Sequence, residues 1–147
     1  MLGEVDCAIT GKAMRYLLNG GDQQDTLEAI LRRACVFARM SPEDKRDLVQ
    51  LLGQGMAPLY PSLPPYPNLG LNVAFCGDGA NDMGALRVAH VGVALGEGDA
   101  LVVAPFTSKS PSIGAVTSVI MEGRNAATSL QHIYQFMVTY GIIQVGR

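Results

Sequence analysis

Charge is scarce in this sequence. Only 16% of its 147 residues are charged, against about 25% in an average soluble domain. Lys and Arg number 11 and Asp and Glu 13, which gives a formal net charge of −2. A strongly basic nucleic-acid-binding protein is therefore excluded, and no nucleic-acid partner is expected. Because hydrophobic residues make up 48% of the sequence, a disordered chain is excluded as well.

Cysteine is also scarce. Cys7, Cys35 and Cys76 are too few and too widely spaced for a disulfide framework or a closed zinc site. This usage favours a reduced, cytosol-facing protein. Glu4 and Asp6 stand where a secretory signal would need a basic start and an apolar run, so no secretory signal is expected.

One long stretch, residues 125–146, carries no formal charge at all. A helix needs about 20 apolar residues to span a bilayer. This stretch is too polar for a clear membrane span, because it contains Gln131, His132, Gln135 and Gln144. Composition alone therefore favours a buried or amphipathic helix over a membrane span.

Strand and helix patterns alternate along the chain. Short strands are predicted at residues 5–9, 35–38, 71–76 and 91–95. Helices are predicted after the capping-box spacing of Asp25 and Glu28, from Ser41 to about Gly53, from about Asn81, and around 112–122 and 125–143. This order is typical of an α/β fold with a parallel sheet and crossover helices, of which only part is present. Such sheets bind ligands at the carboxyl ends of their strands.

A proline-rich segment, PLYPSLPPYP at residues 58–67, holds five of the eight prolines. The overlapping P-x-x-P spacings are those of a polyproline ligand for an aromatic groove. An inserted linker is the simpler interpretation and the one we favour.

The sharpest chemical signal directly follows the predicted strand at 71–76. Asp78 lies between Gly77 and Gly79, and Asp82 follows three residues after Gly79, with Asn81 directly before it. Glycines allow a backbone to approach a ligand closely, and paired carboxylates without nearby His suit a hard cation such as Mg²⁺. The alternative is that Asp82 caps the next helix and Asp78 orders a turn. The position at the carboxyl end of a strand favours the metal site.

A second signal is Lys45, which lies in the first turn of the helix that begins at Ser41. A cation there opposes the helix dipole, although Glu43 and Asp44 partly offset this. Reaching an anion at the strand ends would explain the placement, while a solvated lysine is the ordinary alternative.

Together these motifs resemble the haloacid-dehalogenase superfamily and, within it, the P-type ATPases. FARMSPEDK at residues 37–45 is similar to the family segment that carries the phosphate-stabilising lysine, and CGDGANDMGAL at 76–86 to the magnesium-binding motif. AHVGVAL at 89–95, PFTSKSPSI at 105–113, EGR at 122–124 and YGIIQ at 140–144 narrow the resemblance. They are similar to the fifth class, subgroup B, the polyamine-exporting pumps of endosomes and lysosomes.

The resemblance implies a role for each site residue. Lys45 would stabilise charge on the phosphoryl group that ATP transfers to an aspartate. Asp78 would bind Mg²⁺, Asp82 would support the same site, and Asn81 would hold phosphoryl oxygens. The implied set is Lys45 and Asn81 as catalytic residues, Asp78 and Asp82 as metal ligands, and Gly77 and Gly79 around the cofactor. The turn at residues 9–12 matches the family without an assigned catalytic role.

The resemblance also implies a domain plan and a parent protein. Residues 1–124 would be the C-terminal part of a phosphorylation domain, with 53–70 as the proline-rich insertion. Residues 125–147 would be the stalk and the truncated start of the fifth transmembrane helix, which would make the membrane a partner. The parent would be a multi-pass transporter of cations or polyamines in an endosomal, lysosomal or vacuolar membrane, with this region facing the cytosol.

One departure from the family is decisive for activity. The nucleophile motif Asp-Lys-Thr-Gly-Thr does not occur in the 147 residues. We therefore expect a fragment of a transporter that is inactive in isolation, because it has no phosphoryl acceptor. Two alternatives stay open: a soluble phosphatase of the haloacid-dehalogenase type, and a non-catalytic fragment that binds a partner.

Overall fold

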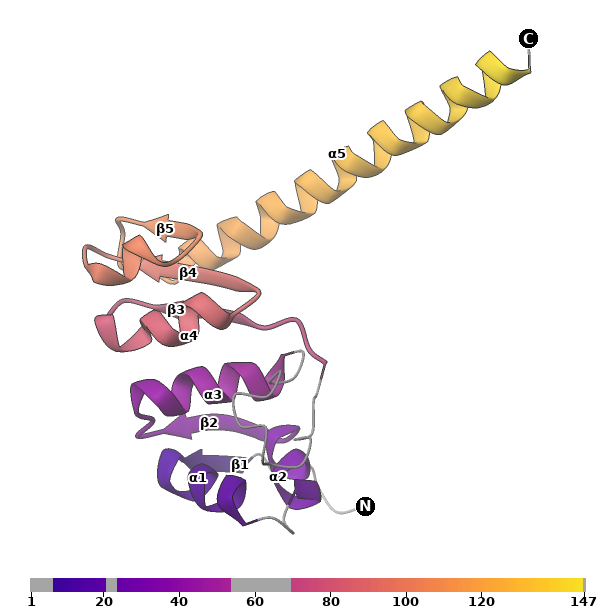
Figure 1. The fold of residues 1–147 in the computed structure, drawn as a ribbon. Coiled ribbons are helices and arrows are strands. Elements are labelled where there is room, and N and C mark those ends of the chain that lie inside the picture. The colour runs from indigo at the N-terminus through magenta and orange to yellow at the C-terminus, as the bar shows by residue number, and fades with distance from the viewer. Residues whose placement is uncertain (1–6, 21–23, 54–69, 147) are drawn as a thin grey trace. The chain divides into compact units, whose positions relative to one another are not determined.

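The computed structural model describes residues 7–20, 24–53 and 70–146 (Figure 1). The proline-rich stretch at 58–67 and its predicted role lie outside these ranges, as does the first part of the strand predicted at 5–9. The chain divides into two compact units, residues 1–111 and residues 112–147. Each unit is described by itself.

The first unit begins with two parallel strands, β1 (Cys7–Thr10) and β2 (Ala34–Ala38). They are joined by α1 (Gly11–Asn19) and α2 (Gln24–Leu31). Helix α1 is absent from the sequence predictions, since Gly11 and Lys12 had the composition of a turn. Thr10 caps it instead: its side chain accepts a hydrogen bond from the Ala13 N–H at 3.3 Å.

Helix α3 (Pro42–Leu52) confirms the predicted helix from Ser41 to Gly53. Ser41 and Asp44 form a complete capping box: the Asp44 N–H donates to Ser41 Oγ at 3.2 Å, and the Ser41 N–H donates to Asp44 Oδ2 at 2.9 Å. Pro42 at the first helical position has a backbone angle suited to the helix. The start of α3 is therefore fixed by local chemistry alone.

A second parallel sheet contains β3 (Ala74–Gly77), β4 (Val91–Leu95) and β5 (Phe106–Ser108), with β4 in the middle. The strand predicted at 71–76 begins later than expected, because Gly70 and Leu71 donate backbone hydrogen bonds to the end of α3. Between the strands lie the 3₁₀ turns η1 (Ala80–Asp82) and η2 (Asp99–Val102) and the helix α4 (Met83–Val88). Strand β5 is a further element that the sequence did not predict.

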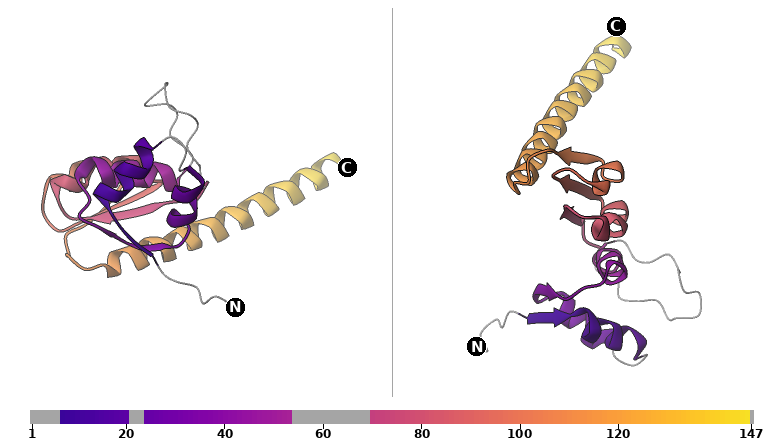
Figure 2. Two further views of the ribbon diagram at one scale, coloured as in Figure 1. Left: turned by 90° about the horizontal axis from the view of Figure 1, so that it is seen from below. Right: turned by 90° about the vertical axis from the view of Figure 1, so that its left-hand side faces the viewer.

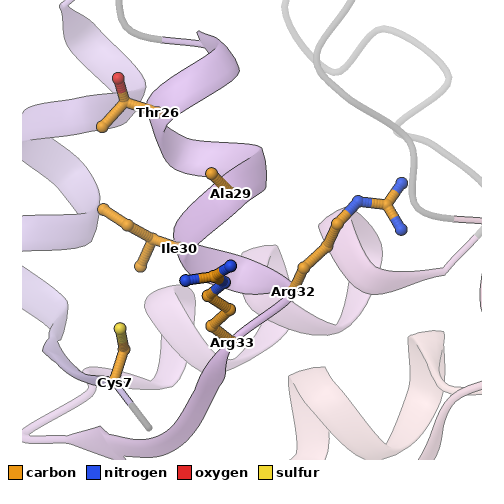
Figure 3. Close-up of a pocket in the computed structure, with 6 residues that line it drawn as sticks. All are labelled: Cys7, Thr26, Ala29, Ile30, Arg32 and Arg33. Atoms are coloured by element: carbon orange, nitrogen blue, oxygen red, sulfur yellow. The ribbon is translucent and has the colours of Figure 1, made fainter. Parts of the chain in front are cut away.

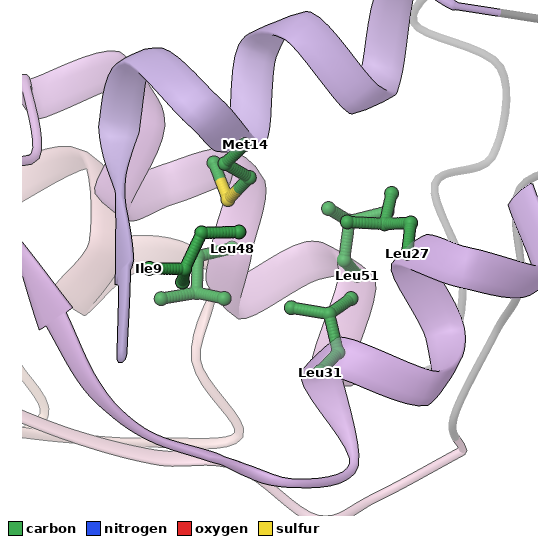
Figure 4. Packing of buried hydrophobic residues seen from close by; sticks show 6 residues of the cluster. All are labelled: Ile9, Met14, Leu27, Leu31, Leu48 and Leu51. Atoms are coloured by element: carbon green, nitrogen blue, oxygen red, sulfur yellow. The ribbon is translucent and has the colours of Figure 1, made fainter. Parts of the chain in front are cut away.

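Helices α1, α3 and α4 are stacked along one side of the strands (Figure 2). The larger apolar core joins α1, α2 and α3 to β1 and contains Ile9, Met14, Leu27, Leu31, Leu48 and Leu51 (Figure 4). A smaller core around Leu86 and Ala94 supports the second sheet. The predicted class, an α/β fold with parallel strands and connecting helices, is confirmed.

The second unit consists mainly of one helix, α5 (Gly114–Val145). It replaces the two helices predicted at 112–122 and 125–143, so the predicted break between them is wrong. Thirty-two residues make a helix about 48 Å long. No helix in the described ranges combines the length and the apolar character that a membrane span requires. The membrane-spanning start assigned to residues 125–147 stays a prediction.

The strand edges of the first unit predict poor behaviour in plain buffer. Within the described residues, β2 pairs only with β1 and β3 only with β4, and Val36 on β2 is 55% exposed. Because unpaired apolar edges promote association, we expect large aggregates that mild detergent disperses, as measured by size exclusion with light scattering. Val36→Lys should increase the monomer fraction more than Thr117→Lys, which adds the same charge on α5. A monomer with a sharp cooperative melt without detergent would contradict this expectation.

Candidate functional site

The site is organised by an ion pair between α3 and the turn after β3. Lys45 Nζ lies 2.6 Å from Asp82 Oδ1. The Lys45 side chain is 26% exposed and that of Asp82 is 8% exposed, so the pair is largely removed from water. This geometry contradicts the alternative of a fully solvated lysine. It also answers why a cation stands in the first turn of α3, where the helix dipole disfavours it.

Asp82 is not used as a helix cap in the described structure. It stands directly before α4 and makes no capping hydrogen bond there; its carboxylate is directed to Lys45 instead. The η1 turn holds its backbone, since the Asp82 N–H donates to the Gly79 carbonyl at 3.0 Å. A buried carboxylate of this kind needs a partner to offset the loss of hydration. Lys45 is that partner.

The two glycines of the turn are required by close approach. A Cβ added at Gly77 would lie 2.7 Å from the Cβ, Cγ and Oδ2 of Asp82. A Cβ added at Gly79 would collide with the Asn81 Oδ1. Any larger residue at Gly77 would therefore move the Asp82 carboxylate, and one at Gly79 would move the Asn81 amide.

Asp78 and Asn81 lie on the open side of this turn, where both side chains are exposed. The thiol of Cys76, the residue before Gly77, reports the local electrostatics. Burial raises the pKa of the Cys76 thiol, and the negative charges of Asp78 and Asp82 raise it further. Both carboxylates thus lie close enough to the Cys76 thiol to raise its pKa; their role as a pair of metal ligands stays a prediction.

These residues match the chemistry of a hard cation in part. Asp78, Asp82 and Asn81 offer oxygen ligands, and Mg²⁺ is commonly held by one or two carboxylates with water and phosphate oxygens completing the shell. Among the described residues, no group of three His, Cys, Asp or Glu side chains could hold a metal ion by itself.

The structure adds one residue that the sequence did not single out, Arg39. It follows β2 directly and has φ +51°, in the left-handed region that non-glycine residues rarely adopt. Arg39 and Lys45 both line a cavity of about 510 Å³ whose other walls include Phe37, Leu48, Val49 and Phe75. Backbone strain of this kind is not visible in a sequence, because Arg has no preference for that conformation.

A second cavity, of about 450 Å³, lies by α2 and is lined by Cys7, Thr26, Ala29, Ile30, Arg32 and Arg33 (Figure 3). Arg32 is engaged there with Glu28 one turn earlier, at 2.7 Å. This cavity contains none of the predicted site residues. The candidate site is therefore the strand-end cluster and not this pocket.

Fold and site together define a class of protein. It is a Rossmann-like α/β domain with a lysine–aspartate pair at the carboxyl ends of its strands. No protein-family profile matches the chain. It is 40% identical over 137 residues to the polyamine-transporting ATPase 13A3 of Mus musculus and 39% identical over 142 residues to the probable cation-transporting ATPase 13A4 of Gallus gallus. It is 39% identical over 139 residues to the vacuolar cation-transporting ATPase YPK9 of Saccharomyces cerevisiae.

These matches cover 93%, 97% and 93% of this chain. The chain in turn spans only 10%, 10% and 8% of the length of the three relatives. The resemblance drawn from the motifs is thereby confirmed. Over nearly its whole length, the chain is homologous to a segment of P-type ATPases of the fifth class, subgroup B.

The glycine contact yields a test of the site geometry. Gly77→Ala should force the Asp82 carboxylate away from Lys45 and destabilise the fold by roughly 1–3 kcal/mol through overpacking. Freed from its partner, Lys45 should be acetylated several times faster, as measured by mass spectrometry. Lys12 and Lys109, both exposed, serve as internal references. Gly123→Ala, where the added methyl meets nothing within 4 Å, is the matched control. Equal Lys45 rates in both variants would refute the contact.

Proposed function

We propose that this chain is the C-terminal part of the phosphorylation domain of an ATP-driven cation or polyamine transporter. In this proposal Lys45, Asp78, Asn81 and Asp82 act on a phosphoryl group that a separate aspartate accepts. The chain by itself contains no Asp-Lys-Thr-Gly-Thr motif. It is therefore inactive alone.

The single observation that carries the proposal is the Lys45–Asp82 ion pair at 2.6 Å. It joins the residues that the sequence motifs had marked separately, 37 positions apart, at the carboxyl ends of β2 and β3. Ligands of open α/β sheets bind at this edge. A lysine held there by one carboxylate is poised to contact a second anion that enters beside it.

The 510 Å³ cavity supports the proposal of a separate strand that carries the acceptor aspartate. Its lining residues come from helix α3 and from in and around the strands β2 and β3. These two strands do not pair with each other in the described chain. Apolar side chains, among them Phe37, Leu48 and Phe75, form its body, and Lys45 and Arg39 also line it. An apolar strand that carries a carboxylate at its end would pair with the unpaired backbone and bring a second anion to Lys45. That is the description of a nucleophile-bearing strand.

The chain's own groups then have distinct tasks. Lys45 offsets the negative charge that gathers on the transferring phosphoryl oxygens, a contribution of electrostatic type. The Asn81 amide donates to one of those oxygens. Asp78 and Asp82 would hold Mg²⁺, which would supply further neutralisation of the negative charge on the phosphate. Because Gly77 and Gly79 have no side chain, the phosphate could approach the backbone of the turn closely.

Helix α5 supports the membrane part of the proposal. It has no buried residue, and its second half exposes Leu130, Ile133, Phe136, Met137, Ile142 and other apolar side chains. Apolar side chains gathered on one helix are normally covered by protein or by lipid, although α5 as a whole is less apolar than a membrane span requires. In the proposed transporter, residues 125–147 connect the cytosolic domain to the membrane of an endosome, lysosome or vacuole.

Phosphoenzyme formation tests the function. With ATP and Mg²⁺, the 147-residue chain should form no acid-stable phosphoenzyme. Long-read sequencing of the transcript then defines any longer product that includes Asp-Lys-Thr-Gly-Thr, and that product should form one, sensitive to hydroxylamine and abolished by EDTA. In it, Lys45→Met should slow phosphoryl transfer by roughly 10²–10³-fold.

The matched control is Lys12→Met, which removes an exposed lysine of α1 outside the site. It should leave the rate of phosphoryl transfer unchanged. Phosphoenzyme on the 147-residue chain would overturn the predicted inactivity. A Lys45→Met variant with the same rate as Lys12→Met would overturn the role of Lys45.

A further inference from the structure

Lys45 is preceded in the chain by a buried carboxylate that the proposed reaction does not use. Asp44 is 2% exposed. The Arg15 Nη1 of helix α1 donates to both of its carboxylate oxygens, at 2.8 Å and 2.7 Å, and to Ser41 Oγ at 3.3 Å. One guanidinium nitrogen of α1 therefore contacts both members of the capping box that starts α3.

The surroundings of Asp44 are built to keep it ionised. Burial by itself would raise the pKa of Asp44, but the hydrogen bonds with Ser41 and the charge of Arg15 outweigh this effect and lower it. Gly11, the first residue of α1, gives the carboxylate its room: a Cβ there would lie 2.5 Å from Asp44 Oδ2 and 2.9 Å from the Arg39 carbonyl oxygen. The same carboxylate thus ties the start of α3 to the start of α1.

We infer that Arg15 is a positioning residue for Lys45 and acts through Asp44. Neighbouring residues of an α-helix point about 100° apart around its axis. Fixing the Asp44 carboxylate against Arg15 and Gly11 therefore fixes the rotation of the first turn of α3. That rotation decides whether the Cα–Cβ bond of Lys45 points toward Asp82.

The inference explains a feature that the capping box alone does not require. Asp44 already satisfies the Ser41 N–H as a cap, and an ordinary cap at a helix start needs no arginine from another helix. A long lysine side chain loses rotamer freedom when it is held in one direction. A rigid first turn reduces the number of directions available to it, and the Lys45–Asp82 pair gains occupancy. Gly11, the first residue of α1, thereby acquires a structural role.

This inference rests on the proposed function only for the meaning of Lys45 in catalysis; the positioning itself is measured separately. In the full 147-residue chain, held in mild detergent where needed, Arg15→Met should increase the acetylation rate of Lys45 about two- to tenfold, the range expected for coupled neighbours. Lys109 provides the reference rate. Gly11→Ala, which displaces Asp44 without removing any charge, should give the same direction of change.

Arg15→Lys keeps the positive charge and should restore a large part of the Lys45 protection. Arg32→Met, which breaks an exposed ion pair one turn apart on α2, is the control and should leave Lys45 unchanged. Thermal unfolding of every variant separates loss of fold from loss of positioning, since unfolding exposes all three lysines equally.

Lower stability of Arg15→Met and Gly11→Ala with an unchanged Lys45 rate would overturn the inference and reduce Arg15 to a structural role. The same result would leave the proposed function intact. Conversely, altered Lys45 labelling together with a Lys45→Met transporter of normal rate would uphold the positioning and reject the proposed function.

Discussion

The ion pair of Lys45 with Asp82 is the constraint on which the site depends. Asp82 is nearly buried, so its charge must be compensated inside the protein. Lys45 provides the compensation from α3, and this contact helps hold α3 against the η1 turn. The absence of a side chain at Gly77 follows from the same requirement, because the Asp82 carboxyl group occupies the space where a Cβ would lie. One contact thus links Lys45 to the Gly77 and Asp82 motif, which lies more than 30 residues further along the sequence.

Local chemistry made part of this fold predictable. Ser41, Pro42 and Asp44 carry a complete signal for a helix start, and β4 has the unbroken apolar run of a buried strand; both elements appear where predicted. Helix α1 was not predicted, because its first residue is Gly11 and its first turn contains no acidic residue, although Met14 and Leu17 have helical spacing. Strand β5, only three residues long, exists through its pairing with β4, and no local pattern encodes such a pairing.

The break predicted within α5 shows a different limit. Gly123 lies between the two expected helices, and a glycine inside a helix costs about 1 kcal/mol relative to alanine. That cost is small against the many favourable residues on either side, so the helix continues through it. A single weak residue predicts a boundary only when the flanking segments are also weak.

The candidate site was predictable in its members and not in its contacts. Asp78, Asp82 and Lys45 stand out by residue type and by position at strand ends or in a helix turn, but nothing in the sequence says that Lys45 meets Asp82. Arg15 gave no signal at all, because an exposed arginine is ordinary, and Asp44 was already explained as an acid in the first turn of a helix. Because the position of Asp44 in the first turn of a helix already had a local explanation, the sequence did not indicate its contact with α1. Its burial and its hydrogen bonds with Arg15 show that contact.

The cavity that Lys45 and Arg39 line bears on the proposed acceptor strand. The 510 Å³ cavity is lined by residues in and around β2, α3 and β3, two of them the cations Lys45 and Arg39. Strands β2 and β3 do not pair with each other in the described chain. Lys45 already pairs with Asp82, and Arg39 is exposed to water, so neither cation by itself demands a further partner. A small anion alone would leave the edges of β2 and β3 unpaired. In the proposed transporter, an extended apolar segment would pair with these edges, and a carboxylate at its end would add a second anion beside Lys45.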